Sequence, residues 1–262
     1  MNEPLRLVSV LTDQTDESGE GTATLARYAA AGHEVMVVTC TGEADADEVP
    51  VLSELLGVGH HRLGFAGSGP WPRGGPLPAG RFASVPIEEP TERLVRVLRE
   101  FRPHVVVMHE NSVELEPDRD RCRRATVAAF DAAADPTRFP DCGAPWQARK
   151  LYNVPEWSEA RMRALHDALR AENLPSPYEE WLKSPTGGAK WITTSVPCAE
   201  FFPVRDEVLR AHAARLEPTC HRFAVPVRLR QTVWPTEDFE LTRCLVATSL
   251  PEDDLLAGIT PL

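Results

Sequence analysis

Carboxylates are concentrated in one short turn near the start of the chain. Asp13, Asp16 and Glu17 follow directly after the apolar stretch LVSVLT and precede a segment with helical character. Carboxylates can transfer protons, bind a cation or interact with the positive end of a helix dipole. Because open α/β sheets bind their ligands where a strand ends before a helix, the turn is typical of such a site. A structural alternative stays open, in which these residues only cap the helix.

A second group of reactive side chains follows the apolar stretch HVVVMHEN at 104–111. His109 stands at the carboxyl end of this expected strand, and Glu116 and Arg119 come shortly after it. Histidine titrates near neutral pH, so His109 and Glu116 could exchange protons with a substrate. Arg119 is a permanent cation. The alternatives are a strand-end histidine with only a structural role and a solvated arginine in the run DRDRCRR.

The segments that must position these residues alternate between strand and helix. The first expected helix, at 22–32, ends at Gly32, and glycine is common at the C-terminal end of a helix. We expect strands at 5–12, 34–41, 61–67, 104–111, 150–154 and 191–198, helices at 22–32, 51–59, 90–101, 158–171 and 201–216, and a loop at 171–190. This order predicts an α/β fold with a Rossmann-like, mostly parallel, doubly wound sheet. We expect a core with the site loops at 1–135 and a smaller C-terminal α/β portion at 136–262 that completes the substrate cleft, together one structural domain. No G-x-G-x-x-G follows the first strand, so a dinucleotide is not implied.

Further candidates for substrate contacts lie outside the two acidic groups. Residues 66–86 form a long segment rich in glycine and proline, and such segments are more often binding loops than linkers. Ser68, Trp71 and Arg73 lie in it, and an exposed tryptophan can stack on a ring. His212 lies on the expected helix at 201–216. For each of these residues, a role in packing or none at all is the alternative.

Several segments, taken in order, resemble one protein family over most of the chain. They are TATLARYAAAGHEVMVVTCT, ERLVRVLREFRPHVVVMHEN, ARMRALHDALR and WPTEDFELTR. The family is that of the PIG-L-type (LmbE-like) N-acetylglucosamine deacetylases, in its actinobacterial branch of mycothiol deacetylases and mycothiol-conjugate amidases. The resemblance implies an LmbE-like fold and a small-molecule substrate, such as a sugar, a thiol-sugar conjugate or a natural-product intermediate. It also adds Thr15 and Glu17 to the candidate substrate contacts.

The same register implies that the zinc site of the family has been rewritten. In the family, the first strand ends in His-Pro-Asp-Asp-Glu. Its His and second Asp bind zinc, and its first Asp is the general base. In this chain, Thr15 occupies the position of the base and Asp16 that of the second Asp. The third ligand comes from the last His of Gly-His-Pro-Asp-His, where this chain has Arg119, and the catalytic His of that segment is Glu116. A guanidinium cannot coordinate zinc, and threonine is no base near neutral pH. Of the three expected ligands only Asp16 is left.

We therefore expect no zinc site, and an ion-pair network between Arg119 and the carboxylates in its place. Three functions compete. The preferred one is metal-free acid–base chemistry by Asp13, Asp16, His109, Glu116 and Arg119. The second is a metal-dependent deacetylase or amidase in which Asp13, Asp16 and Glu116 hold a hard divalent cation such as Mg²⁺ or Mn²⁺. The third is a binding protein without catalysis.

Composition limits the partners and the compartment. The 262 residues carry a net charge of −11 with a pI near 5.2, which argues against binding to nucleic acid or to an anionic membrane. We find no membrane span and no signal peptide, so we expect a cytoplasmic protein whose homo-oligomerisation stays open. The six cysteines form no C-x-x-C pair and are predicted to be reduced thiols.

Overall fold

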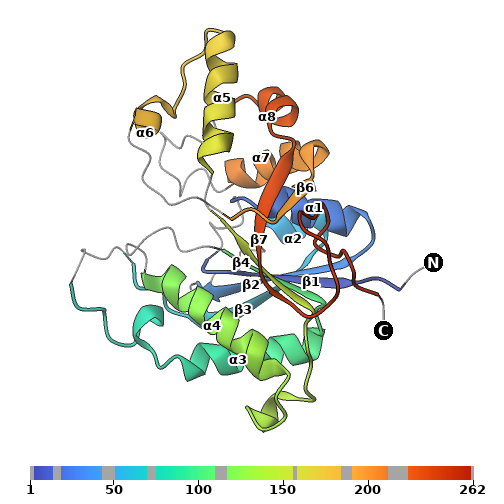
Figure 1. The fold of residues 1–262 in the computed structure, drawn as a ribbon. Helices are drawn as coiled ribbons and strands as arrows, with labels where there is room; N and C mark the ends of the chain where they lie inside the picture. Colours follow the sequence, from blue (N-terminus) through green and yellow to red (C-terminus); the bar gives the residue numbers. More distant parts are fainter. Residues whose placement is uncertain are drawn as a thin grey trace.

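One seven-stranded sheet organises the protein (Figure 1). The computed structural model describes residues 3–13, 19–42, 51–69, 75–109, 117–155, 158–183, 191–211 and 224–260. In them the strand order is β3-β2-β1-β4-β5-β7-β6; the first five of these strands are parallel, and β7 runs antiparallel to both β5 and β6. The strands are β1 (Arg6–Leu11), β2 (Glu34–Thr41), β3 (Gly59–Phe65), β4 (Val105–His109), β5 (Lys150–Val154), β6 (Thr194–Pro197) and β7 (Thr236–Cys244).

Helices cover both faces of the sheet. α3 and α4 lie on one face, and α1 lies on the other, where α7 packs against it and α5, α6 and α8 extend away from the sheet (Figure 1). The helices are α1 (Thr22–Ala30), α2 (Val51–Leu56), α3 (Glu88–Phe101), α4 (Pro117–Ala133), α5 (Glu159–Ala171), α6 (Glu179–Lys183), α7 (Phe202–Ala211) and α8 (Val227–Val233). The predicted doubly wound α/β fold is confirmed.

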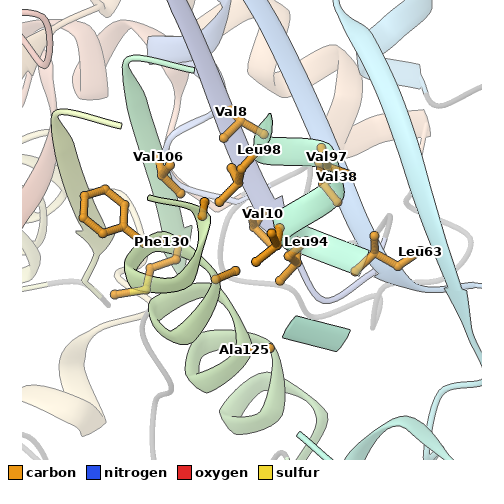
Figure 2. Close-up of a cluster of buried hydrophobic side chains, with 14 of the residues drawn as sticks. Val8, Val10, Val38, Leu63, Leu94, Val97, Leu98, Val106, Ala125 and Phe130 are labelled. Atoms are coloured by element: carbon orange, nitrogen blue, oxygen red, sulfur yellow. The ribbon is translucent and has the colours of Figure 1, made fainter. Parts of the chain in front are cut away.

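Alternate residues of the central strands point into two apolar cores. On the face of α3 and α4, Val8 and Val10 of β1 meet Leu94 and Leu98 of α3 and Phe130 of α4 (Figure 2). The intervening residues of β1 face the core shared with α1. Strands that are buried on both faces must be apolar almost throughout, which is why they are evident in the sequence.

The boundaries of most predicted elements agree with the structure. Gly32 has a φ of 88° just beyond α1, a left-handed conformation that suits glycine after a helix end. One prediction is wrong, because the expected loop at 171–190 contains the short helix α6. Three elements were not predicted, namely α4, α8 and β7, because their sequences carry many charges.

Two other predictions concern membrane spans and the state of the cysteines. Within the described residues, no helix has the length and apolar character that a membrane crossing requires. The five described cysteines are free thiols, in agreement with the sequence, and four of them are buried.

Candidate functional site

The chain order of the strands reverses between β1 and β4. β1 leads through α1 to β2 on one side, whereas β4 leads through α4 to β5 on the other. β1 and β4 are parallel neighbours in register from Leu7 with Val105 to Val10 with Met108. Ligands of doubly wound sheets bind at the carboxyl ends of the two strands where the order reverses. This position coincides with the start of the acidic turn.

Two predicted site residues lie at this edge of the sheet. Asp13 follows the end of β1, and His109 is the last residue of β4; both are partly exposed. Val105 and Val107 of β4 face the core on the side of α1, so strand alternation directs His109 to that face as well. The strand-end position of His109 is confirmed, while its contact with a substrate stays a prediction.

Residues on either side of the acidic turn have defined backbone geometry. At its start, the carbonyl oxygen of Thr12 accepts hydrogen bonds from the backbone N–H of Thr41 at 2.7 Å and from its hydroxyl at 2.9 Å. At its far end, Gly21 precedes α1 with a φ of 95°, and a Cβ there would lie 3.4 Å from a methyl of Val154. The positive φ therefore favours glycine at this position, whereas a Cβ would make only an ordinary contact with Val154.

A buried network of ion pairs includes Glu20, which follows the acidic turn in the sequence. The carboxylate of Glu20 accepts hydrogen bonds from both terminal nitrogens of Arg161, at 2.7 and 3.2 Å. Arg205 approaches the same carboxylate at 3.6 Å and that of Glu237 at 3.5 Å. Both arginines are almost fully buried, and such charges are tolerated only when they are paired. The network joins α5, α7 and β7 to the end of the turn.

Glu237 of β7 caps α1 from far away in the sequence. Its buried carboxylate accepts hydrogen bonds from the N–H groups of Ala23 at 3.3 Å and Thr24 at 2.8 Å, and from the hydroxyl of Thr24 at 2.8 Å. These N–H groups belong to the first turn of the helix, where backbone N–H groups have no hydrogen-bond partners within the helix. Burial, and then the charge of Glu20, raises the pKa of Glu237. Burial and the carboxylate of Glu237 also raise the pKa of the Cys198 thiol, which makes this cysteine a poor nucleophile.

Arg119 lies in the first turn of α4. Pro117 opens this helix, a position that suits proline because its missing N–H is not needed there. Further along, Arg123 and Arg124 pair with Asp120 at 3.4 and 3.6 Å. The run DRDRCRR is thus helical, and Arg119 is partly buried. Its direction towards the acidic turn stays a prediction.

The base of the glycine- and proline-rich loop is fastened to the same helical turn. Asp118 accepts hydrogen bonds at 2.6 Å from both the N–H and the hydroxyl of Ser68. The N–H of Ala83, at the return of the loop, donates to the Ser68 oxygen at 3.4 Å, and the carbonyl of Ala83 accepts hydrogen bonds from Arg121. Ser68 therefore anchors the loop to α4, and whether it also contacts a substrate stays a prediction.

Asn153 of β5 is a polar residue of this region that the sequence reasoning missed. It is 6% exposed, and its amide nitrogen donates to Glu240 of β7 at 3.3 Å. Within the described part of the chain its buried carbonyl oxygen has no hydrogen-bond partner. The available signal was an amide side chain near the end of the expected strand KLYNV, since buried polar residues are informative.

Seven of the predicted site residues lie outside the described residues. They are Thr15, Asp16, Glu17, Trp71, Arg73, Glu116 and His212. The structure thus places Asp13, His109, Ser68 and Arg119 on elements around one edge of the sheet. Among the residues it describes, no three side chains of the types His, Cys, Asp and Glu are close enough together to hold a metal ion.

Solved structures share this fold. N,N'-diacetylchitobiose deacetylase from Pyrococcus horikoshii matches with a TM-score of 0.59 and 12% identity over 90% of this chain and 83% of that one. GalB, the 4-carboxy-2-hydroxymuconate hydratase from Pseudomonas putida, also matches with 0.59 and 12% identity, over 94% and 99%. At these identities the likeness establishes an LmbE-type α/β fold, which hosts more than one reaction, and nothing finer.

Curated relatives define the family. Mycothiol S-conjugate amidase of Streptomyces coelicolor is 40% identical over 99% of both chains. The 1D-myo-inositol 2-acetamido-2-deoxy-α-D-glucopyranoside deacetylase of Streptomyces avermitilis is 31% identical over 98% of both chains. No family model matches the chain. The chain belongs to the PIG-L/LmbE-like deacetylase family, in the branch of these mycothiol-pathway amidases and deacetylases.

Proposed function

We propose that this protein acts on a small molecule with an N-acylated amino sugar, and that it does so by acid–base chemistry without zinc. The relatives' names describe acetamido-sugar and thiol-conjugate substrates, and full-length identity of 40% supports a substrate of that class. The observation that carries the metal-free part is Arg119 in the first turn of α4, at the register position of a zinc-binding histidine. The proposed site lies at the carboxyl edge between β1 and β4.

The residues at the three ligand positions do not fit zinc. A catalytic zinc needs three protein ligands that are imidazole, thiolate or carboxylate. Arg119 offers only donors and a positive charge, which would repel a dication. Asp13 stands where the family has its first histidine, which leaves a set of carboxylates and one cation. The proton transfers would then come from these side chains alone.

Hydrolysis of an amide at such a site would need three functions. A carboxylate, Asp13 or Glu116, would remove a proton from water as its oxygen attacks the amide carbon. The guanidinium of Arg119 would stabilise the oxyanion that forms. His109, when protonated, would donate a proton to the nitrogen as the carbon–nitrogen bond breaks, releasing the carboxylic acid and the amine. Positioned proton transfer of this kind contributes about 10²- to 10⁴-fold to the rate.

Metal analysis tests the metal-free part. Elemental analysis of the purified protein is expected to find far less than one equivalent of zinc, manganese or magnesium. The double variant Asp13→His/Arg119→His would restore a His-Asp-His set with Asp16 and should bind close to one equivalent of zinc. The matched control is Asp13→His/Arg123→His, with the second histidine one turn further along α4. One equivalent of a divalent metal in the wild-type protein would contradict the proposal and favour the metal-dependent alternative.

Turnover tests the catalytic part. The wild-type protein is incubated with 1D-myo-inositol 2-acetamido-2-deoxy-α-D-glucopyranoside and with mycothiol S-conjugates, and the released acid and amine are measured by mass spectrometry. We expect turnover that resists chelators and falls about 100-fold or more in Asp13→Ala or Glu116→Ala. Unchanged turnover in both variants would refute the assigned roles. Binding without any turnover would instead support a non-catalytic relative.

A further inference from the structure

Asn153 has one amide atom that is fixed and one that is unused. It pairs in register with Glu240 of β7 on one side and with Met108 of β4 on the other. A carboxylate only accepts hydrogen bonds, so Glu240 fixes the NH₂ group of Asn153 on the β7 side. The carbonyl oxygen is then the atom of this amide that has no hydrogen-bond partner among the described residues.

Asn153 lies near the carboxyl end of β5, beside the end of β4 that borders the proposed site, and strand alternation places it on the opposite face of the sheet from His109. β4 ends at His109, one residue beyond the register partner of Asn153. Met108 and Leu151 belong to the core under α3 and α4, so Asn153 lies on the face of the sheet that α4 covers. α4 is also the helix whose first turn carries Arg119.

A buried carbonyl oxygen without a hydrogen-bond donor is unfavourable and rare in folded proteins. Asn153 also occurs in a strand whose other four residues are buried. An apolar residue would fill the same space without the unfavourable contribution. A ligand that brings a donor to this oxygen would account for both the residue type and its orientation.

We propose that Asn153 is a substrate-binding residue that accepts a hydrogen bond from the amide N–H of an N-acylated amino sugar, with Glu240 as the positioning residue that fixes its amide. The inference rests on the proposed substrate class and deepens it. The hydroxyl groups of a sugar can donate or accept, so either kind of partner satisfies them, whereas an amide N–H can only donate. Asn153 would thus distinguish an amide from an ester.

The test compares two ligands and four proteins by calorimetry. The ligands are 1D-myo-inositol 2-acetamido-2-deoxy-α-D-glucopyranoside and its 2-O-acetyl analogue, in which oxygen replaces the N–H. The wild-type protein should bind the amide about tenfold or more tightly than the ester, the effect of one neutral hydrogen bond in a buried site. Asn153→Leu should bind both equally. Gln147→Leu removes an amide near the opposite end of β5, where Gln147 bonds to a backbone carbonyl, and should keep the preference.

A second variant tests the orientation without a change in volume. In Glu240→Gln the new amide can donate to the carbonyl oxygen of Asn153, so the Asn153 amide is free to turn over. The preference for the amide ligand should therefore shrink while the fold is kept. If Asn153→Leu and Glu240→Gln both keep the tenfold preference, the inference is wrong and the proposed function stands. If neither ligand binds the wild-type protein, the proposed substrate class fails, and this inference fails with it.

Discussion

Replacing Lys150 with methionine should destabilise the protein severely, because it leaves a buried carboxylate without its counter-ion. The ammonium group of Lys150 on β5 lies 2.5 Å from the carboxylate of Glu252, and the two side chains are 0% and 1% exposed. The hydroxyl of Tyr152 donates to the same carboxylate at 2.5 Å, and that of Thr194 donates at 3.2 Å. The cluster attaches the C-terminal segment to β5 and β6.

The magnitude follows from burial. Removing one partner of a fully buried ion pair costs about 3–5 kcal/mol. For a chain of this size, a loss of that order lowers the melting temperature by roughly 6–20 °C. The same Lys→Met change at Lys183, whose ion pair with Glu180 has the same 2.5 Å separation but is exposed, should leave the free energy of unfolding almost unchanged. Urea unfolding of both variants measures the difference.

The pH dependence supplies an independent readout. Burial opposes ionisation of Glu252, but hydrogen bonds from Lys150, Thr248 and Tyr152 outweigh it and lower the pKa of the carboxyl below its ordinary value. This stabilisation is present above the unfolded pKa of about 4.3 and is lost as the pH falls through the folded value. Without Lys150 we expect burial to raise that pKa, so Lys150→Met should instead gain stability as the pH decreases towards 4.

A double-mutant cycle can refute this reasoning. In Lys150→Met/Glu252→Gln no charge is left buried, so the double variant should be about 1–3 kcal/mol more stable than the sum of the single changes predicts. Additive costs would show that the two groups are not coupled. A loss below about 1 kcal/mol in Lys150→Met would show that water reaches the carboxylate.

Three further predictions concern other contacts. The pKa of His60 is lowered to about 4, first by burial and then by the charges of Arg62 and His61. The free energy of unfolding should therefore fall as the pH drops from about 6.5 to 4. Urea unfolding of His60→Gln should show a weaker fall. Arg99 donates to six backbone carbonyls between residues 132 and 143, and Arg99→Met should lose about 2–4 kcal/mol in the same assay. Ser68→Ala should lower the free energy of unfolding by about 1 kcal/mol and accelerate proteolytic cleavage at 69–80, with the cleavage sites mapped by mass spectrometry.

The sequence was most informative where a strand is buried on both faces. β1, β2 and β4 are nearly continuous apolar runs, and Gly32 marks the end of α1, so this half of the fold could be predicted from local pattern. The strand-end position of His109 followed directly from that pattern. The register of the acidic turn came from the family resemblance, which full-length relatives support.

The rest depended on contacts between residues far apart in the chain. β7 contains Glu237 and Asp238, which look solvated in sequence but are buried because donors from other elements reach them. α4 looks like a charged surface run, whereas its small residues, such as Ala125 and Ala129, form a stripe against the sheet. No local pattern reveals that a carboxylate has a buried partner more than 100 residues away.

Arg161 offers a last test, because the proposed metal-free function requires the acidic turn to be held by protein contacts alone. Arg161 binds Glu20 at the end of that turn and is almost fully buried. In Arg161→Met, hydrogen exchange of peptides spanning 12–21 should become faster, since the turn loses its contact with α5. Arg163→Met is the matched control, on the same helix but in an exposed pair with Glu159 at 2.6 Å. Equal exchange in both variants would mean that something other than this ion pair fixes the turn, and a bound cation would then be the first candidate to examine.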